Sequence, residues 1–229
     1  MKKFYKEATV VETAGGFSIT LDGRPVKTPM KIALEVQSKP LAEAIADEWN
    51  EQGDEIDPAT MPMTGLANAM IDRIAPDPTA TIDELVRYLG SDMVCYRADD
   101  GPLLESQNAI WGAYQTWFEE KLGEKLAVTS GIMPVSQSEK LLDQYRSSLN
   151  TLTAHHLTAL KELTGLLGSA VLGFALLEGF KDAAAIWHAS DLERVHQADL
   201  WGTDEEAEEV AAKRRKDFED AFRFLSFAN

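Results

Sequence analysis

The chain has almost none of the cysteine that disulfides and zinc clusters require. Its 229 residues include one cysteine, Cys95, so an intrachain disulfide and a cysteine-based zinc cluster are both excluded. Histidine is also scarce, with four residues. His155 and His156 are adjacent, and neighbouring side chains on a helix point about 100° apart. We therefore expect this pair to cap a helix or to lie at the surface rather than to bind one metal ion.

Positive charge is the second shortage. The 22 lysines and arginines stand against 38 aspartates and glutamates, which gives a formal net charge of −16 at pH 7. Phosphate backbones and anionic membrane surfaces would repel such a chain, so the composition argues against nucleic-acid binding and membrane-surface binding. The acidity favours solubility and a partner with a basic or mixed surface.

No apolar run is long enough to cross a membrane. The least polar stretch, Leu163 to Leu177, has fifteen residues without a charge, and a bilayer crossing needs about 20. This stretch predicts a central helix that is buried on all sides. The N-terminal Met1-Lys2-Lys3 is followed by a polar stretch instead of an apolar segment, so we expect neither a signal nor a transit peptide.

The usual motifs of catalysis are missing too. The sequence contains no glycine-rich phosphate loop and no Gly-x-Ser-x-Gly elbow. Glu193 and His196 form one Glu-x-x-His pair, which is half of the motif that binds two iron ions in helical bundles. The chain has no second copy of the pair. We therefore expect no metal and no other cofactor.

The sequence does contain a clear hairpin near its start. Phe17, Ile19 and Leu21 alternate with polar residues, which predicts a strand with one apolar face. Asp22-Gly23 then predicts a tight type I′ turn. A third alternating run follows at Ile32, Leu34 and Val36, so we expect a small antiparallel meander.

Two cations follow the turn of this hairpin. Arg24 and Lys27 fit solvated charges on an edge strand, where they discourage association with other strands. The same pair is also compatible with a clamp for a phosphate or a carboxylate. The sequence favours the first interpretation and leaves the second open.

Helical periodicity begins after the meander and continues to the C-terminus. Ser38, and the pairs Ser136/Glu139 and Thr203/Glu206, predict helix starts. Met93 to Tyr96 predicts a short strand, with residues 126–128 as its counterpart. The final helix is expected to turn Ala207, Val210, Phe218, Phe222 and Leu225 inward. The predicted helices cover residues 38–53, 66–74, 82–90, 103–122, 136–149, 157–177, 182–200 and 203–225.

These elements predict an α+β fold. We expect a small N-terminal antiparallel β-rich domain over residues 1–75, with one or two helices, and a larger all-helical domain over residues 76–229. A boundary as late as about residue 130 is the alternative.

One helix carries a strip of polar and ionisable groups. Glu193, His196, Gln197 and Asp199 precede Trp201 on the predicted helix 182–200. The strip fits an internal hydrogen-bond network or a surface that faces a partner, for which a tryptophan flanked by charges is a suitable anchor. Glu193 and His196 could also serve as the acid and base of an enzyme that uses a polar cleft.

An ordered set of motifs resembles one known family. The set spans nearly the whole chain and includes Leu21-Asp-Gly-Arg-Pro-Val-Lys-Thr-Pro29, Glu48-Trp49-Asn50, Met61-Pro62-Met63-Thr64, Tyr88 to Arg97, Gln107 to Trp111, and Leu192-Glu193 through Gln197 to Trp201-Gly202. It resembles the assembly chaperones for the catalytic sector of F-type ATP synthase, of the mitochondrial type that holds the free α subunit. The chain departs from the family pattern at Arg194, Asn50 and Ser106.

The resemblance implies a chaperone without catalysis or cofactor. Its implied partner is the ATP synthase α subunit, kept from aggregating until the β subunit replaces the chaperone. It favours partner binding by Glu193, His196, Gln197, Asp199 and Trp201, in a protein that is monomeric when free. The implied location is the bacterial cytoplasm, and the mitochondrial matrix for eukaryotic members. A small-molecule enzyme and a constitutive subunit of a larger complex remain the alternatives.

Overall fold

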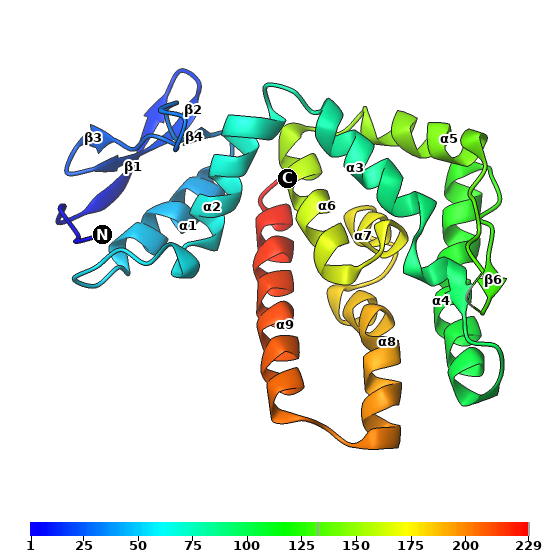
Figure 1. The fold of residues 1–229 in the computed structure, drawn as a ribbon. Coiled ribbons are helices and arrows are strands. Elements are labelled where there is room, and N and C mark those ends of the chain that lie inside the picture. Colours follow the sequence, from blue (N-terminus) through cyan, green and yellow to red (C-terminus); the bar gives the residue numbers. More distant parts are fainter. Residues whose placement is uncertain (132, 229) are drawn as a thin grey trace. The chain divides into compact units, whose positions relative to one another are not determined.

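The computed structural model describes residues 1–131 and 133–228. It has antiparallel strands at the N-terminal end and is mostly helical after them, so the predicted α+β class is confirmed (Figure 1). The chain forms two compact units. The first contains Met1–Pro78 with Ala154–Ala159 and the segment from Asp220 onward, and the second contains Thr79–Thr153 with Leu160–Glu219. The first unit thus includes two late segments that fall within the predicted 76–229 domain, and the division into domains 1–75 and 76–229 stays a prediction.

The first unit is built on a small antiparallel sheet. Strands β1 (Ala8–Thr13), β2 (Gly16–Leu21) and β3 (Arg24–Pro25) pair in that order, and β4 (Glu35–Val36) also pairs with β2. Asp22 and Gly23 connect β2 to β3 with φ angles of 48° and 78°. Both φ values are positive, as a type I′ turn requires, so the predicted turn is confirmed.

The sheet differs from the sequence prediction in two ways. β1 was not among the predicted strands, because most of its side chains are exposed and its residues show no apolar alternation. Ser18 and Thr20 were assigned to a polar face of β2, yet both are buried. Thr20 is tolerated there because its hydroxyl lies 2.9 Å from the hydroxyl of Thr9 on β1.

Helix α1 (Lys39–Asn50) fastens the sheet to the next helix through two residues of one motif. Ser38 caps its start through the Leu41 N–H, as predicted. Near its end, Asn50 exchanges two hydrogen bonds, of 2.8 and 2.9 Å, with the backbone of Ala8 on β1. The buried Glu48 carboxylate accepts hydrogen bonds from the backbone N–H groups of Met63 and Thr64, at the start of α2 (Pro62–Ala69). Glu48 and Asn50 of this motif are therefore structural.

A tight loop follows β3 and displays an exposed methionine. Asp72, in the π-helical turn Met70–Ile74, accepts the Thr28 hydroxyl at 2.5 Å and the Met30 N–H at 3.1 Å. Lys31 adopts a positive φ of 66°, and the Met30 side chain is 65% exposed. Of the third apolar run predicted from the sequence, only the part at Glu35–Val36 forms a strand, β4. Ile32 lies in this loop instead and is exposed.

Helices dominate the rest of the chain (Figure 1). A two-stranded parallel pair, β5 (Tyr96–Arg97) with β6 (Thr129–Ser130), interrupts them, so the predicted counterpart at residues 126–128 was three residues early. The short 3₁₀ turns are Pro58–Thr60 and Met93–Cys95. The remaining helices are α3 (Thr79–Gly90), α4 (Gly101–Leu122), α5 (Glu139–Leu149), α6 (Ala154–Leu167), α7 (Ala170–Leu177), α8 (Ala183–Trp201) and α9 (Glu205–Ser226).

The apolar stretch Leu163 to Leu177 is two helices rather than the one predicted. Gly168 has a φ of +68°, which ends α6, and Ser169 caps α7. The carboxylate of Asp92 accepts hydrogen bonds from the Ser169 hydroxyl at 2.7 Å and the Val171 N–H at 3.0 Å. Nearly every residue of α7 is buried, as expected. Within the described residues, no helix is both long and apolar enough to span a membrane.

Two predicted helix caps were wrong by one or two residues. At the start of α5, the Leu141 N–H donates to the Ser138 side chain and not to Ser136. At the start of α9, the Glu206 N–H donates to the Asp204 side chain and not to Thr203. In both cases two capping residues lie close together, and local sequence does not choose between them. His155, expected at a helix cap or at the surface, is half-buried: its ring stacks on Phe224 at 4.2 Å and lies 2.7 Å from the Phe224 carbonyl oxygen, in the last turn of α9.

Candidate partner-binding surface

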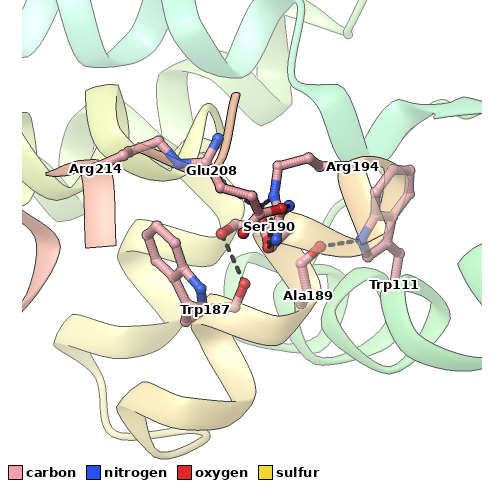
Figure 2. A network of polar contacts seen from close by, with 8 residues as sticks. Trp111, Trp187, Ala189, Ser190, Arg194, Glu208 and Arg214 are labelled. Atoms are coloured by element: carbon pink, nitrogen blue, oxygen red, sulfur yellow. Dashed lines mark hydrogen bonds and ion pairs between the residues drawn. The ribbon is translucent and has the colours of Figure 1, made fainter. Parts of the chain in front are cut away.

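Helix α8 carries the predicted strip, and α4 holds this helix in place. The indole N–H of Trp111 on α4 donates to the Ala189 carbonyl oxygen at 2.8 Å (Figure 2). Gln107, one turn earlier on α4, accepts the Ala98 N–H at 2.7 Å and donates to the Glu193 carboxylate at 2.8 Å. Both α4 side chains are buried, so they fix the position and rotation of α8.

A charged network ties α8 to α9 (Figure 2). The buried carboxylate of Asp191 accepts hydrogen bonds from the guanidinium groups of Arg194 and Arg214, the shortest at 2.6 Å in each case. Arg194 also pairs with Glu208 at 3.0 Å. The hydrogen bond to Asp191 raises the pKa of Arg194. The Arg214 guanidinium lies over the Trp187 ring at 4.7 Å, so charge and packing act at the same point.

The structure brings some of the predicted residues onto one stripe and separates another. At about 100° per residue, Glu193, His196 and Gln197 share a face of α8 with Leu200, while Asp199 lies about 120° from Glu193. Trp201 lies at the edge of the stripe, about 80° from Glu193. His196 is half-buried, and the other predicted members are exposed. Their part in partner binding stays a prediction.

Large apolar side chains are exposed where α8 ends and α9 begins. Trp201 is 84% exposed, Leu200 62% and Val210 64%. We call these three residues the α8–α9 tip. Leu200 was not among the predicted site residues, although its spacing of seven from Glu193 places it on the same stripe.

The orientation predicted for α9 was wrong for three residues. Ala207, Val210 and Phe222 are exposed, whereas Phe218 and Leu225 are buried as expected. The inward stripe was extended along the whole helix, but only part of α9 packs against a core. Ala207, Val210 and Ala211 instead line a shallow groove of about 400 Å³ together with Arg194 and Arg214. The groove therefore combines apolar walls with two arginines of the charged network.

The side chains of this surface are poorly placed for catalysis. Neither Glu193 nor His196 lines the adjacent groove. Among residues 1–131 and 133–228, no group of three or more histidine, cysteine, aspartate or glutamate side chains could hold a metal ion. The surface is suited to non-covalent contact with a macromolecule, because an exposed tryptophan, aliphatic side chains and flanking charges lie together along α8 and α9.

Two buried carboxylates with raised pKa values, Asp92 and Glu48, are structural. Burial raises the pKa of Asp92 to about 6, although the hydrogen bonds from Val171 and Ser169 act in the opposite direction. Burial also raises the pKa of Glu48, against the hydrogen bonds from Thr64 and Met63. Each carboxylate caps the first turn of a helix, α7 and α2 respectively. Their perturbed pKa values therefore do not indicate a catalytic site.

Comparison with known proteins gives consistent matches. The family model described as "ATP12 chaperone protein" matches residues 2–119. The mitochondrial protein atp12 of Schizosaccharomyces pombe is 26% identical over 224 residues, covering 91% of this chain and 76% of that protein. The crystal structure of Atp12 from Paracoccus denitrificans is 36% identical, with a TM-score of 0.92, and the match covers 100% of this chain and 98% of that one. A chaperone-like structure from Agrobacterium tumefaciens is 35% identical, with a TM-score of 0.93, over 100% of this chain and 86% of that one.

Proposed function

We propose, since this chain belongs to the ATP12 chaperone family, that it assists assembly of the catalytic sector of ATP synthase by holding the free α subunit. Members of this family are described as chaperones rather than enzymes, which confirms the chaperone class expected from the motifs. The finer assignment, to the α subunit, follows from the resemblance of the ordered motifs. The chaperone would occupy the apolar surface that the β subunit later covers and would leave when that subunit arrives.

The exposed α8–α9 tip is the observation that carries this proposal. A side chain such as Trp201 would lose most of its exposed area in a complex, and burial of apolar area is the main source of binding free energy. Tryptophan is also among the residues that most often dominate protein interfaces. The tip is anchored through α8 by Trp111 and Asp191, so little conformational entropy is lost when it binds.

Glu193 is the polar member of the proposed surface. One carboxylate oxygen accepts from Gln107, which orients the group while the side chain stays exposed. The other oxygen has no hydrogen-bond partner within the described part of the chain and is available to a donor on the α subunit. His196, Gln197 and Trp201 would contact the same partner, and Asp199, on another face of α8, would contribute at the margin.

We further propose that the free protein is a monomer in the bacterial cytoplasm. The two bacterial relatives of known structure support the bacterial assignment. A single copy suffices, because the proposed surface lies on α8 and α9 of one chain. Analytical ultracentrifugation tests the monomer, and a stable dimer that buries Trp201 would contradict it.

The test is protection of the host's own α subunit from aggregation, followed by light scattering and by pull-down. Trp201→Ser should weaken capture by at least about tenfold, because it removes the largest exposed apolar side chain. Glu193→Gln should cause a smaller loss, since it keeps the size of the side chain and removes its charge. Glu120→Gln is the matched control, because Glu120 is an exposed glutamate on α4 of the same unit.

The outcomes of this assay test the proposed binding surface and the proposed chaperone function separately. Full protection of the α subunit by both Trp201→Ser and Glu193→Gln would show that the binding face lies elsewhere on the molecule. Failure of the unmutated protein to protect its α subunit would overturn the chaperone assignment to that subunit. Co-purification at fixed stoichiometry with a finished complex would favour the constitutive-subunit alternative.

A further inference from the structure

The first unit contains a hollow that the proposed function does not use. It has a volume of about 500 Å³, and its lining includes the aromatic residues Phe4, Tyr5 and Trp49 and the cations Arg24 and Lys27. A volume of this size accommodates one or two side chains of a bound segment. The two cations belong to the Leu21 to Pro29 motif, where they fit either solvated edge charges or a clamp for a phosphate or carboxylate.

The aromatic part of the wall is rigid. The Phe4 and Tyr5 rings meet edge to face at 5.4 Å, and the Tyr5 and Trp49 rings do so at 5.6 Å. The Tyr5 hydroxyl donates to the Trp49 carbonyl oxygen at 2.6 Å, which fixes the segment before β1 against α1. Phe4 is nevertheless 67% exposed. The wall is therefore preorganised and still offers apolar surface.

The two cations of the hollow, Arg24 and Lys27, do not stabilise the fold through polar contacts of their side chains. Lys3, by contrast, donates to the carbonyl oxygens of Asn50 and Gln52 and lies over the Tyr5 ring. Within residues 1–131 and 133–228, the side chains of Arg24 and Lys27 make no hydrogen bond and no ion pair, and both are exposed. In a chain with a net charge of −16, two unpaired cations beside one hollow create a local site for a negative group.

One aromatic residue that lines the hollow also has a polar atom without a partner. The indole nitrogen of Trp49 is buried and has no hydrogen-bond partner in the described part of the chain. Asp22, the acid in the wall, already accepts the backbone N–H groups of Lys6 and Glu7.

We propose that this hollow is a second docking site, which takes an aspartate or glutamate adjoining an aromatic residue on an extended segment of the client polypeptide. The carboxylate would pair with Arg24 and Lys27, and the aromatic ring would pack against Phe4 and Trp49. A single carboxylate suits the site better than a polyphosphate, because Asp22 and the acidic chain repel further negative charge. The inference rests on the proposed function for the identity of the client.

The test follows the Trp49 indole resonance in a ¹⁵N–¹H spectrum, assigned with Trp49→Phe. The probe is the peptide Ac-Gly-Asp-Phe-Gly-NH₂, and its isosteric control is Ac-Gly-Asn-Phe-Gly-NH₂. The acidic peptide should shift the Trp49 resonance, and the control peptide should bind at least about tenfold more weakly. The double variant Arg24→Gln/Lys27→Gln should weaken binding of the acidic peptide by at least about tenfold. Lys31→Gln/Lys39→Gln, which removes two exposed cations of the same unit outside the hollow, should leave it unchanged.

Each other outcome overturns the docking site. These outcomes are no response of Trp49, equal binding of the two peptides, an equal response to inorganic phosphate, or unchanged binding by Arg24→Gln/Lys27→Gln. The aggregation assay keeps the two proposals distinct. If the unmutated protein protects the α subunit but ignores the acidic peptide, this inference fails and the proposed function stands; the reverse pair of results leaves the docking site and removes its proposed client.

Discussion

Replacing Asp191 with asparagine should destabilise the protein strongly although the two side chains have almost the same size. The Asp191 side chain is 7% exposed and receives hydrogen bonds from two guanidinium groups, whereas Arg194 and Arg214 are 35% and 36% exposed. Breaking a buried ion pair costs about 3–5 kcal/mol. The arginines can regain part of their hydration, so we expect Asp191→Asn to lower the free energy of unfolding by about 2–4 kcal/mol.

The measurement is urea unfolding followed by circular dichroism, with thermal unfolding alongside. For a chain of this size the expected loss corresponds to a fall in Tm of about 5–12 °C. Asp199→Asn is the matched control, because Asp199 lies exposed on the same helix and makes no ion pair within the described residues. That control should change the free energy of unfolding by less than about 0.5 kcal/mol.

A double-mutant cycle then tests whether the charge contacts cause the effect. Arg214→Gln and Asp191→Asn should be less than additive when combined, with a coupling free energy of at least about 1 kcal/mol. A stability of Asp191→Asn within about 0.5 kcal/mol of the unmutated protein would refute the reasoning. Full additivity with Arg214→Gln would show that the loss does not arise from the contact between Asp191 and Arg214.

Three further predictions concern the internal anchors. Asn50→Ala removes two hydrogen bonds from Ala8 and should lower the free energy of unfolding by about 1–3 kcal/mol, visible as a lower urea midpoint; an unchanged midpoint would contradict it. Gly168→Ala places a side chain at a φ of +68° and should cost about 1–2 kcal/mol in the same experiment, whereas Gly165→Ala, at a position with open space, should not. Burial raises the pKa of Asp92 from 3.8 to about 6, so the folded state binds this proton more tightly, and the stability that protonation contributes is lost as pH rises from about 4 to 6. The stability of the unmutated protein relative to Asp92→Asn should therefore fall by about 3 kcal/mol across that pH range, and a flat difference would contradict the pKa shift.

Features set by a few neighbouring residues could be predicted from the sequence. Asp22-Gly23 has a strong backbone preference for its turn, and α8 begins after Asp182 and ends before Gly202, as expected. Capping preferences did not identify the correct helix start where two capping residues lie close together, as with Ser136 and Ser138. Local preferences also failed for β1, whose position depends on Asn50 and β2 rather than on its own side chains.

The candidate site was partly predictable for the same reason. Helical spacing places Glu193 and Leu200 on one stripe, so Leu200 could have been found from the sequence. The exposure of Val210 could not, because an apolar residue on an amphipathic helix is expected inward unless the packing of the whole chain is known. The family motifs posed a different problem, since Glu48 and Asp92 carry the resemblance but cap helices inside the molecule.

The loop that displays Met30 gives the protein a chemical reporter of its own surface. The Met30 side chain is exposed while those of Met61 and Met63 are buried, so mild peroxide should convert Met30 to the sulfoxide well before the other two. Because Asp72 holds the loop through the backbone of Met30 and the hydroxyl of Thr28, this oxidation changes the polarity of the loop without removing the contacts that shape it. Mass spectrometry of Met30 oxidation, with and without a bound client, would thus show whether that face is covered in the complex, in a protein that carries no substitution.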